Sequence, residues 1–489
     1  MSVNPERSAT APTPSPASSP PVPASGVGST AALIALGLAA LLAVLDGTVV
    51  AVALQPLARA FEAPLTTVVW VTIGYLLAVA SMLPLLGWAT ARFGGRAVFL
   101  TGLGLFVAGS TLCAAAWSVG SLIAFRVIQG FGGGLLEPTS LALAAGLAGR
   151  DRVGRVLGTM SMIINVAPVL GPLLGGAIAG NGHWRWIFIL NVPLGLGVLS
   201  AALGFVPADR PDPGPGPRPA ADVRGLLLLT IGYLAVLFAL NQAGRPGPAL
   251  LTWAAAGLGV LLLAGYVRYA LSTSRAPALD LRLLRRPGFA AALLVMGFVG
   301  LIMYSQVTAL PMFGADRHHL RGIEQGLLVC ALGLGLLVSM TLSGRISDRT
   351  GPRPLVRAGA VVTAGGLLCF ALTHDRLPLP VVFVLLLVIG LGFGSTAAPT
   401  FASVYRTLPA AEQAQGTTAM FMTVQLTASL GVTLLGVLQG RAPGQWLTVL
   451  FLLLAAAALA IAAIGGALPG RRDPDVIFSK LVWKASGLM

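Results

Sequence analysis

The chain has 489 residues and a formal net charge of +15; 56% of its residues are hydrophobic and only 10% are charged. Soluble proteins carry about 25% charged residues, so this composition excludes an ordinary soluble fold and predicts an all-α protein that crosses the membrane many times. The positive charge does not indicate nucleic-acid binding, because the basic residues lie in short loops between apolar runs, as the positive-inside rule predicts.

Residues 1–28 form a tail rich in proline, serine and alanine, a composition that predicts disorder. The tail lacks the basic start of a signal peptide, so the first apolar run is predicted to remain as an uncleaved span. The three cysteines and four histidines show no metal-ligand spacing, and no metal site is expected.

Fourteen apolar runs predict fourteen transmembrane helices, since a helix needs about 20 residues to cross the hydrocarbon. The predicted spans are 30–54, 66–88, 97–117, 118–146, 154–180, 185–206, 223–242, 248–268, 288–313, 324–344, 355–374, 379–405, 415–439 and 446–468. An even number of spans places both termini on the same side of the membrane.

The basic residues decide which side that is. Of the 31 Lys and Arg residues, 23 fall on the N-terminal side of the predicted topology and Arg126 lies within a span. The other seven are Arg59, Arg185, Arg245, Arg317, Arg321, Arg376 and Arg441. Both termini are therefore predicted to be cytoplasmic. The preference for Arg over Lys is typical of a GC-rich genome, and the expected location is the inner membrane of a bacterium.

Two seams divide the predicted spans into blocks. A Pro/Gly-rich cytoplasmic linker at 207–222 follows the sixth span, and a basic loop near 270–287 precedes the ninth. The resulting organisation is a six-helix bundle at 29–206, a two-helix insertion with its basic loop at 223–287, and a second bundle at 288–468. A cytoplasmic tail, 469–489, completes the chain.

A short internal repeat supports this division. GWATARFGGR (87–96) follows the second span, and GRISDRTGPR (344–353) follows the second span of the later bundle. Parallel repeats of this kind predict two pseudo-symmetric halves around a central cavity and an alternating-access mechanism.

Four further motifs carry a family resemblance, in the same order along the chain. They are LDGTVVAVALQPLA (45–58), RVIQGFGGG (126–134), APVLGPLLGG (167–176) and WRWIFILNVPLG (184–195). With the repeated loop, they resemble the major facilitator superfamily, in particular its fourteen-helix drug:proton antiporter branch. The resemblance implies the major facilitator fold and export of drugs or antibiotics. It further implies a proton gradient as energy source, no cofactor, and a monomer.

The resemblance also assigns conformational roles to loop and helix residues. In the two loop copies these are Gly87, Arg92, Gly94, Arg96, Gly344, Asp348, Arg349 and Gly351. In the fifth-span antiporter motif they are Gly171, Pro172, Gly175 and Gly176, expected to pack against the other half and limit leak. The first loop departs from the family pattern, because Ala91 stands where an Asp is usual; this predicts a weaker conformational lock.

Asp46 is an acid near the middle of the first span, where a carboxylate is expensive and usually marks a transport pathway. Asp46 and Arg126 each lie eight residues from the outer end of a span, about 12 Å deep, so they are expected to meet beside a water-accessible cleft. Burial favours the neutral acid and the guanidinium favours the carboxylate, as a proton carrier requires. A permanent structural ion pair and direct binding of a cationic substrate are the alternatives.

Two more side chains of the fourth span bear on this site. Gln129 lies one turn from Arg126 and is expected either to hydrogen-bond Asp46 or hold Arg126, or only to pack between helices. Glu137 lies on nearly the same face, about 16 Å nearer the cytoplasm. It is predicted to attract a cationic drug or relay a proton; the alternative is a carboxylate in a wet inner vestibule.

The later bundle offers flexible and amide side chains for a substrate cavity. Candidates are Tyr304 and Gln306 in the ninth span and Met422 and Gln425 in the thirteenth, although ordinary helix packing also explains them. No acid lies within the spans of this bundle, which favours a neutral or monocationic amphiphile over a dication.

The sequence contains no motif of an enzyme. A Walker loop needs a lysine, and the only two lysines, Lys480 and Lys484, lie in the tail; HExxH and CxxC motifs are also absent from the sequence. The leading hypothesis is proton-coupled export of amphipathic drugs or antibiotics. The alternatives are a dedicated exporter of one natural product, and a transporter-like receptor or scaffold that moves nothing.

Overall fold

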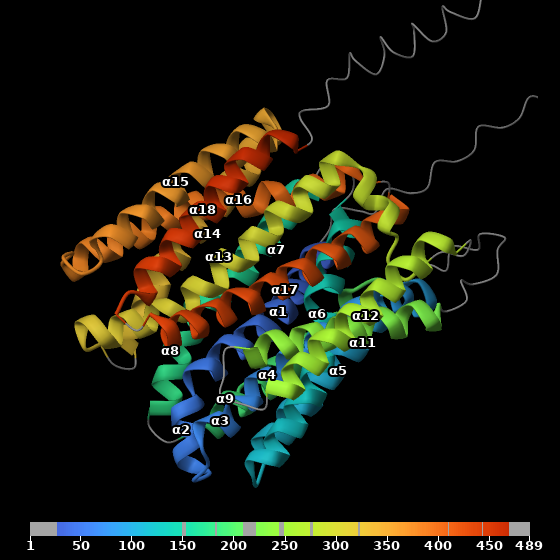
Figure 1. Cartoon of the computed structure of the whole chain (residues 1–489). Helices are drawn as coiled ribbons and strands as arrows, with labels where there is room; N and C mark the ends of the chain where they lie inside the picture. The colour runs from blue at the N-terminus through green and yellow to red at the C-terminus, as the bar shows by residue number, and fades with distance from the viewer. Residues whose placement is uncertain are drawn as a thin grey trace, which may run out of the picture.

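The computed structural model describes residues 27–148, 153–180, 183–208, 222–243, 249–273, 277–320, 323–408, 410–442 and 444–468. All regular structure within these ranges is helical (Figure 1). Most of the predicted N-terminal tail and linker, and the whole C-terminal tail 469–489, lie outside the described residues. The first helix begins at Val27, inside the range predicted as tail.

The N-terminal group contains six apolar helical segments and two short helices. Its elements are α1 (Val27–Val52), α2 (Leu54–Ala60), α3 (Leu65–Val68), α4 (Trp70–Phe93), α5 (Gly95–Ala114), α6 (Val119–Ala148), α7 (Val153–Asn165), α8 (Ala167–Gly180), α9 (Arg185–Ile189) and α10 (Asn191–Phe205). The short helices are α2 and α3, and two of the six segments are interrupted, one between α7 and α8 and one between α9 and α10. Most of the helical sequences are apolar on all sides, whereas α7 is amphipathic and α6 carries Arg126, Gln129 and Glu137.

The rest of the chain forms an insertion and a C-terminal group. The insertion is α11 (Val223–Ala243) and α12 (Ala249–Ser272), followed by the 3₁₀ helix η1 (Leu281–Arg285). The C-terminal group is α13 (Pro287–His318), α14 (Ile323–Thr350), α15 (Pro352–Thr373), α16 (Leu379–Thr407), α17 (Ala410–Arg441), α18 (Trp446–Ile464) and the 3₁₀ turn η2 (Gly465–Ala467).

Thirteen helices among the described residues are long and apolar enough to cross a membrane. The predicted fifth span is the exception, because α7 and α8 divide it at Val166. Pro168 has no backbone N–H to donate to the Ile164 carbonyl, and three residues earlier the Asn165 side chain donates to the Ser161 carbonyl at 2.7 Å. The count of fourteen membrane-crossing helices therefore stays a prediction.

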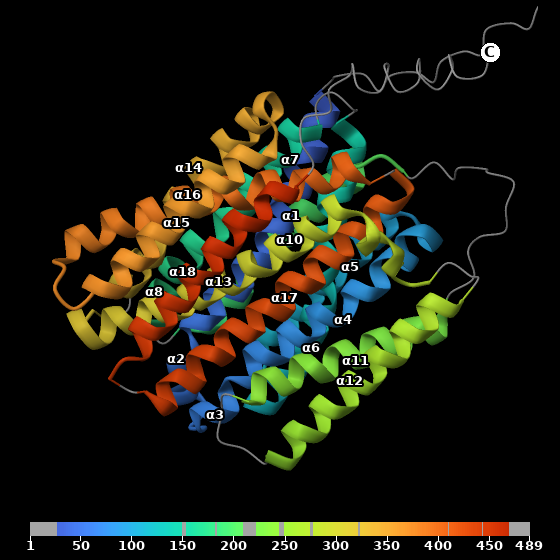
Figure 2. The ribbon, with the colours of Figure 1, turned by 45° about the horizontal axis from the view of Figure 1, so that its top comes forward.

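The two six-helix groups lie side by side, each around its own apolar core (Figures 1 and 2). They meet where α14 lies along α7 and α8, and where α17 lies along α4. Phe401 of α16 and Phe421 of α17 also pack against the core of the N-terminal group. The interface is thus formed by α4, α7 and α8 of the N-terminal group and by α14 and α17 of the C-terminal group, with Phe401 of α16 beside them.

The insertion covers one side of this interface. Helix α11 contacts both α4 and α17, and α12 lies at the outer edge (Figure 2). Only 11% of the apolar window of α12 is buried, compared with 67% in α14, so α12 faces lipid along most of its length. Tyr233 of α11 donates a hydrogen bond to the Met422 carbonyl of α17 at 2.9 Å, and Thr433 of α17 donates to the Leu240 carbonyl of α11.

The two copies of the repeated loop have the same geometry. Gly94 has φ 88° and Gly351 has φ 82°, a region that favours glycine, and each N–H donates to the carbonyl four residues earlier at 2.9 Å. Two residues later, Arg96 donates to the Leu203 carbonyl at 2.7 Å and Arg353 donates to the Leu468 carbonyl at 2.5 Å. Each loop is thereby tied to the end of the sixth span of its own group.

Candidate functional site

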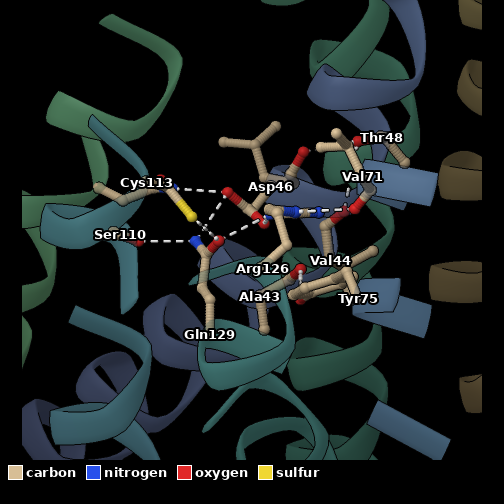
Figure 3. A network of polar contacts seen from close by, with 12 residues as sticks. Ala43, Val44, Asp46, Thr48, Val71, Tyr75, Ser110, Cys113, Arg126 and Gln129 are labelled. Carbon is tan, nitrogen blue, oxygen red and sulfur yellow. Dashed lines mark hydrogen bonds and ion pairs between the residues drawn. The ribbon is translucent and has the colours of Figure 1, made fainter. Parts of the chain in front are cut away.

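Asp46 lies inside the N-terminal group, on α1, with 1% of its surface exposed. Its Oδ2 accepts a hydrogen bond from Arg126 Nη1 of α6, a fully buried side chain, and the two form an ion pair (Figure 3). The structure therefore brings together the two charges that the sequence placed at equal depth. It does not place Asp46 in a water-accessible cleft, because neighbouring helices enclose the carboxylate in this conformation.

Two amides complete the shell of the carboxylate. Gln129 Nε2 donates to Asp46 Oδ1 at 3.0 Å and to Ser110 Oγ at 2.6 Å, while its Oε1 accepts from Arg126 Nη1 at 2.7 Å (Figure 3). Asn191, the first residue of α10, donates from Nδ2 to the same Asp46 Oδ1 at 2.8 Å. A buried carboxylate is stabilised by such donors, which compensate for lost hydration.

Arg126 is held from its other side by α4. Its Nε donates to the Val71 carbonyl at 3.3 Å, and its guanidinium carbon lies 3.9 Å from the centre of the Tyr75 ring. The Tyr75 hydroxyl donates to the Ala43 carbonyl of α1 at 2.9 Å, and Phe188 lies 5.7 Å from the guanidinium. Arg126 Nη2 has no hydrogen-bond partner among the described residues. The charge is thus fixed in place by one carboxylate and an aromatic face.

Glycines of α6 make this close packing possible. A Cβ on Gly130 would lie 2.6 Å from the Tyr75 carbonyl, and one on Gly133 would lie 2.6 Å from the Tyr75 hydroxyl. A Cβ on Gly134 would meet the Val79 carbonyl at 2.6 Å. The absence of side chains here lets α4 approach α6 and brings the tyrosine ring over Arg126.

The arrangement is one titratable acid whose charge is balanced by one arginine in a region without bulk water. Breaking one partner of such a pair leaves a buried charge, which is costly. Proton uptake by Asp46 would remove the attraction that holds Arg126 and leave the guanidinium without its counter-ion. The site can therefore couple a protonation event to a change in helix packing.

The sequence did not assign Asn191, Tyr75 or Ser110 to this site. Asn191 is buried and contacts Asp46. The available signal was a single amide in an otherwise apolar stretch, since a polar group at membrane depth needs a partner. Tyr75 and Ser110 carried no comparable signal.

Glu137 and Tyr304 lie on different groups. Glu137 is half-buried on α6, and Tyr304 is half-buried on α13, where its carbonyl accepts from the Thr308 hydroxyl at 2.8 Å. That the two side chains share one substrate cavity stays a prediction.

The other predicted cavity residues have different surroundings. Gln306 is buried and donates to the Ile302 carbonyl at 3.3 Å, while its Oε1 has no partner among the described residues. Met422 does not lie in a central cavity but packs in an apolar cluster with Tyr233 and Tyr266 of the insertion. Gln425 is half-buried on α17. The sequence does not reveal how α17 is rotated about its axis. The face that contacts the insertion therefore could not be distinguished from the face that contacts the N-terminal group.

The antiporter motif packs first against α1. A Cβ on Gly171 would collide with the Thr48 hydroxyl and lie 2.6 Å from Thr48 Cβ, two residues after Asp46. The Thr48 hydroxyl also donates to the Ala167 carbonyl of α8 at 3.3 Å. Gly175 is buried, and the surroundings of Pro172 and Gly176 lie outside the described residues. Helix α8 does contact α14 of the other group, but Gly171 serves the turn that carries Asp46.

We expect Gly171→Ala to disturb that turn. Overpacking of this kind costs about 1–3 kcal/mol, and here the displaced residue adjoins the acid. The substitution should lower both the melting temperature and the rate of substrate transport in reconstituted vesicles. Gly158→Ala on α7 is the matched control, because nothing lies within 4 Å of a Cβ at that position. Equal behaviour of the two variants would contradict this role of Gly171.

Apart from the two glycines with positive φ, most of the predicted loop residues have room around them or are exposed. A Cβ on Gly87 or Gly344 would meet nothing within 4 Å. Arg92 and Arg349 are exposed, Ala91 is also exposed, and the side chain of Asp348 lies outside the described residues. The predicted difference between the two conformational locks therefore stays a prediction.

Comparisons with known proteins agree with this geometry. A sequence model of the Major Facilitator Superfamily matches residues 36–432. The chain is similar to the multidrug resistance protein B homolog of Mycobacterium tuberculosis, with 34% identity over 412 residues, 82% of this chain and 74% of that protein. It is also similar to the tetracenomycin C resistance and export protein of Streptomyces glaucescens, with 27% identity over 416 residues, 84% and 76% of the two chains. Its fold is similar to that of the human organic anion transporter MFSD10, with a TM-score of 0.63 and 17% identity, over 89% of this chain and 99% of that one.

Proposed function

This chain belongs to the Major Facilitator Superfamily, and on that premise we propose that it exports amphipathic drugs or antibiotics in exchange for protons, by alternating access. The observation that carries the proposal is the buried Asp46–Arg126 pair, enclosed by Gln129 and Asn191. Intramembrane acids of transporters commonly serve as proton carriers.

In the proposed cycle, Asp46 exchanges protons with the two sides of the membrane in alternation. A proton from the outside neutralises the carboxylate and releases Arg126, which favours the conformation open to the cytoplasm. Substrate then enters from the cytoplasm or the inner leaflet. Loss of the proton to the inside restores the pair and favours the outward-open conformation, from which the substrate leaves.

The substrate is an amphiphile that is neutral or carries one positive charge. Glu137 and Tyr304 support this class, because α6 and α13 offer one half-buried carboxylate and one half-buried phenol from the two groups. The relative from Mycobacterium tuberculosis carries a multidrug resistance name, and the similarity supports a drug-like substrate here. We place the protein in the inner membrane of a bacterium, as a monomer with both termini in the cytoplasm.

Glu137→Gln should separate charged from neutral substrates. Loss of a carboxylate that faces a cation weakens its binding by about tenfold, whereas a neutral amphiphile of equal size should be transported almost unchanged. The measurement is the apparent KM for each member of a panel of monocationic and neutral compounds in reconstituted vesicles. Glu324→Gln, at the start of α14, is the control. Equal effects of Glu137→Gln on both classes would remove Glu137 from substrate recognition.

The proposed exchange is tested by proton movement in vesicles that contain the purified protein. Addition of a transported compound to the cytoplasmic side should drive protons in the opposite direction, reported by a pH-sensitive dye. Substrate movement with no associated proton movement would contradict antiport. No movement of any compound would support a transporter-like receptor or scaffold.

A dedicated exporter of one natural product is the second candidate. It is favoured by the similarity to the tetracenomycin C resistance and export protein, which is named for one compound. The same panel distinguishes the two functions, since a dedicated exporter moves one scaffold and its close analogues, whereas a multidrug exporter moves chemically unrelated amphiphiles.

A further inference from the structure

An apolar pocket of about 210 Å³ lies between the insertion and the C-terminal group. Its walls come from α11, α12, the segment before α13, α13 itself and α17; Tyr233, Leu263, Leu281, Leu284 and Met422 are among them. The pocket lies toward the basic ends of the helices, where the linker and the loop near 270–287 join them. It is separate from Asp46 and Arg126, which lie within the N-terminal group.

The pocket has a fixed frame. Tyr266 of α12 donates to the Leu279 carbonyl at 2.7 Å, and the Leu279 N–H donates back to the same hydroxyl at 2.7 Å. The Asp280 N–H donates to Gln415 of α17 at 3.1 Å. These bonds hold the segment that precedes η1 against both the insertion and the C-terminal group. The wall that this segment contributes to the pocket is therefore fixed by hydrogen bonds.

Basic residues adjoin the lining of the pocket in sequence. Arg282 and Arg285 flank the lining residues Leu283 and Leu284 of η1, are exposed, and form no ion pair within the described part of the chain. Arg286 is engaged with Glu412 of α17 at 3.0 Å, which neutralises that pair. Asp280 is the one acid in the lining, and its carboxylate accepts from the Arg282 N–H at 2.9 Å as the cap of η1. Two exposed arginines thus adjoin the pocket lining along η1, whereas Asp280 caps η1 and Asp222 accepts from the Tyr269 hydroxyl at 2.6 Å and from the Ala278 N–H at 3.2 Å.

We propose that this pocket binds an anionic phospholipid of the cytoplasmic leaflet. An acyl chain fills the apolar space between α12 and α17, and the phosphate contacts Arg282 and Arg285. Basic sites between transmembrane helices on the cytoplasmic side recognise anionic head groups in this manner. The lipid joins the insertion to the C-terminal group at the side of the molecule where α11 bridges the two halves. The proposal does not depend on what the protein transports.

The test is a titration of the purified full-length protein with phosphatidylglycerol, followed by native mass spectrometry. The native chain should retain phosphatidylglycerol in preference to phosphatidylcholine of the same acyl composition, and inorganic phosphate should not compete. Arg282→Gln combined with Arg285→Gln should weaken phosphatidylglycerol retention by about 30-fold, because both arginines are lost and each contributes about equally to the binding free energy of the anionic head group. Arg357→Gln, an exposed arginine on α15 away from the insertion, should have little effect.

A second variant tests the apolar part. Ala419→Phe places a ring in the pocket from α17 and should weaken retention of both lipids while the arginines remain. Equal retention of the two lipids by the native chain, or unchanged preference in the double arginine variant, would overturn the proposal. Binding of tetraphenylphosphonium that is lost in Asp280→Asn would also overturn it, because the occupant would then be a cation.

Discussion

Asp46→Asn abolishes proton-coupled transport and leaves exchange of substrate for substrate in place. Asparagine keeps the size of the side chain and an Oδ1 that can accept from Gln129 and Asn191, as Asp46 does now at 3.0 and 2.8 Å. It resembles the protonated acid but cannot release a proton. Accumulation of substrate against its gradient should therefore fall to the level of protein-free vesicles, measured as dye-reported proton flux together with labelled-substrate uptake.

The matched control is Asp316→Asn, which removes an exposed acid near the outer end of α13 and should retain coupled transport. Loss of substrate exchange in Asp46→Asn would indicate that the acid serves binding or folding. Coupled transport that survives in Asp46→Asn would assign the proton to another acid, with Glu137 as the next to test.

Arg126→Gln produces the largest loss of stability expected in this chain. The substitution leaves the Asp46 carboxylate buried with only the two amides, and removal of one partner from a buried pair costs about 3–5 kcal/mol. Proton uptake by the carboxylate relieves this cost. The variant should therefore be least stable at high pH and should recover as the pH falls, as shown by its melting temperature in detergent across a pH series.

A double substitution separates the ion pair from simple loss of packing. Asp46→Asn combined with Arg126→Gln contains no uncompensated charge and should regain most of the stability that Arg126→Gln loses. Arg185→Gln serves as control, because Arg185 donates to the Ala116 carbonyl at 3.1 Å and forms an ion pair with no carboxylate among the described residues. A melting temperature of Arg126→Gln that is equal to that of Arg185→Gln and independent of pH would contradict the account.

Most of the fold follows from the sequence because apolar length is a strong signal. The predicted span 379–405 corresponds to α16 at Leu379–Thr407, and 223–242 corresponds to α11 at Val223–Ala243. The ends of the helices are less well predicted. Hydropathy reports which residues lie in the hydrocarbon of the membrane, and a helix can continue beyond that region. Helix α14 continues from the predicted end at 344 to Thr350. The break between α7 and α8 was missed because an averaged hydropathy does not register one absent N–H.

The site was predictable where the depth of a residue along its helix is sufficient information. Asp46 and Arg126 were paired because they lie at equal depth in their spans. Depth does not fix the direction in which a helix faces. For that reason Met422 was expected in the central cavity but packs against the insertion, and Asn191 was not assigned to the site although it contacts Asp46.

The central claim is that substrate changes the protonation of Asp46, and proton release on substrate addition tests it most directly. The panel compound that is transported fastest is added to purified protein in weakly buffered detergent solution, and the pH change is recorded for the native chain and for Asp46→Asn. The account predicts proton release from the native chain and none from the variant. Equal release from both proteins, or none from either while binding is retained, would contradict it.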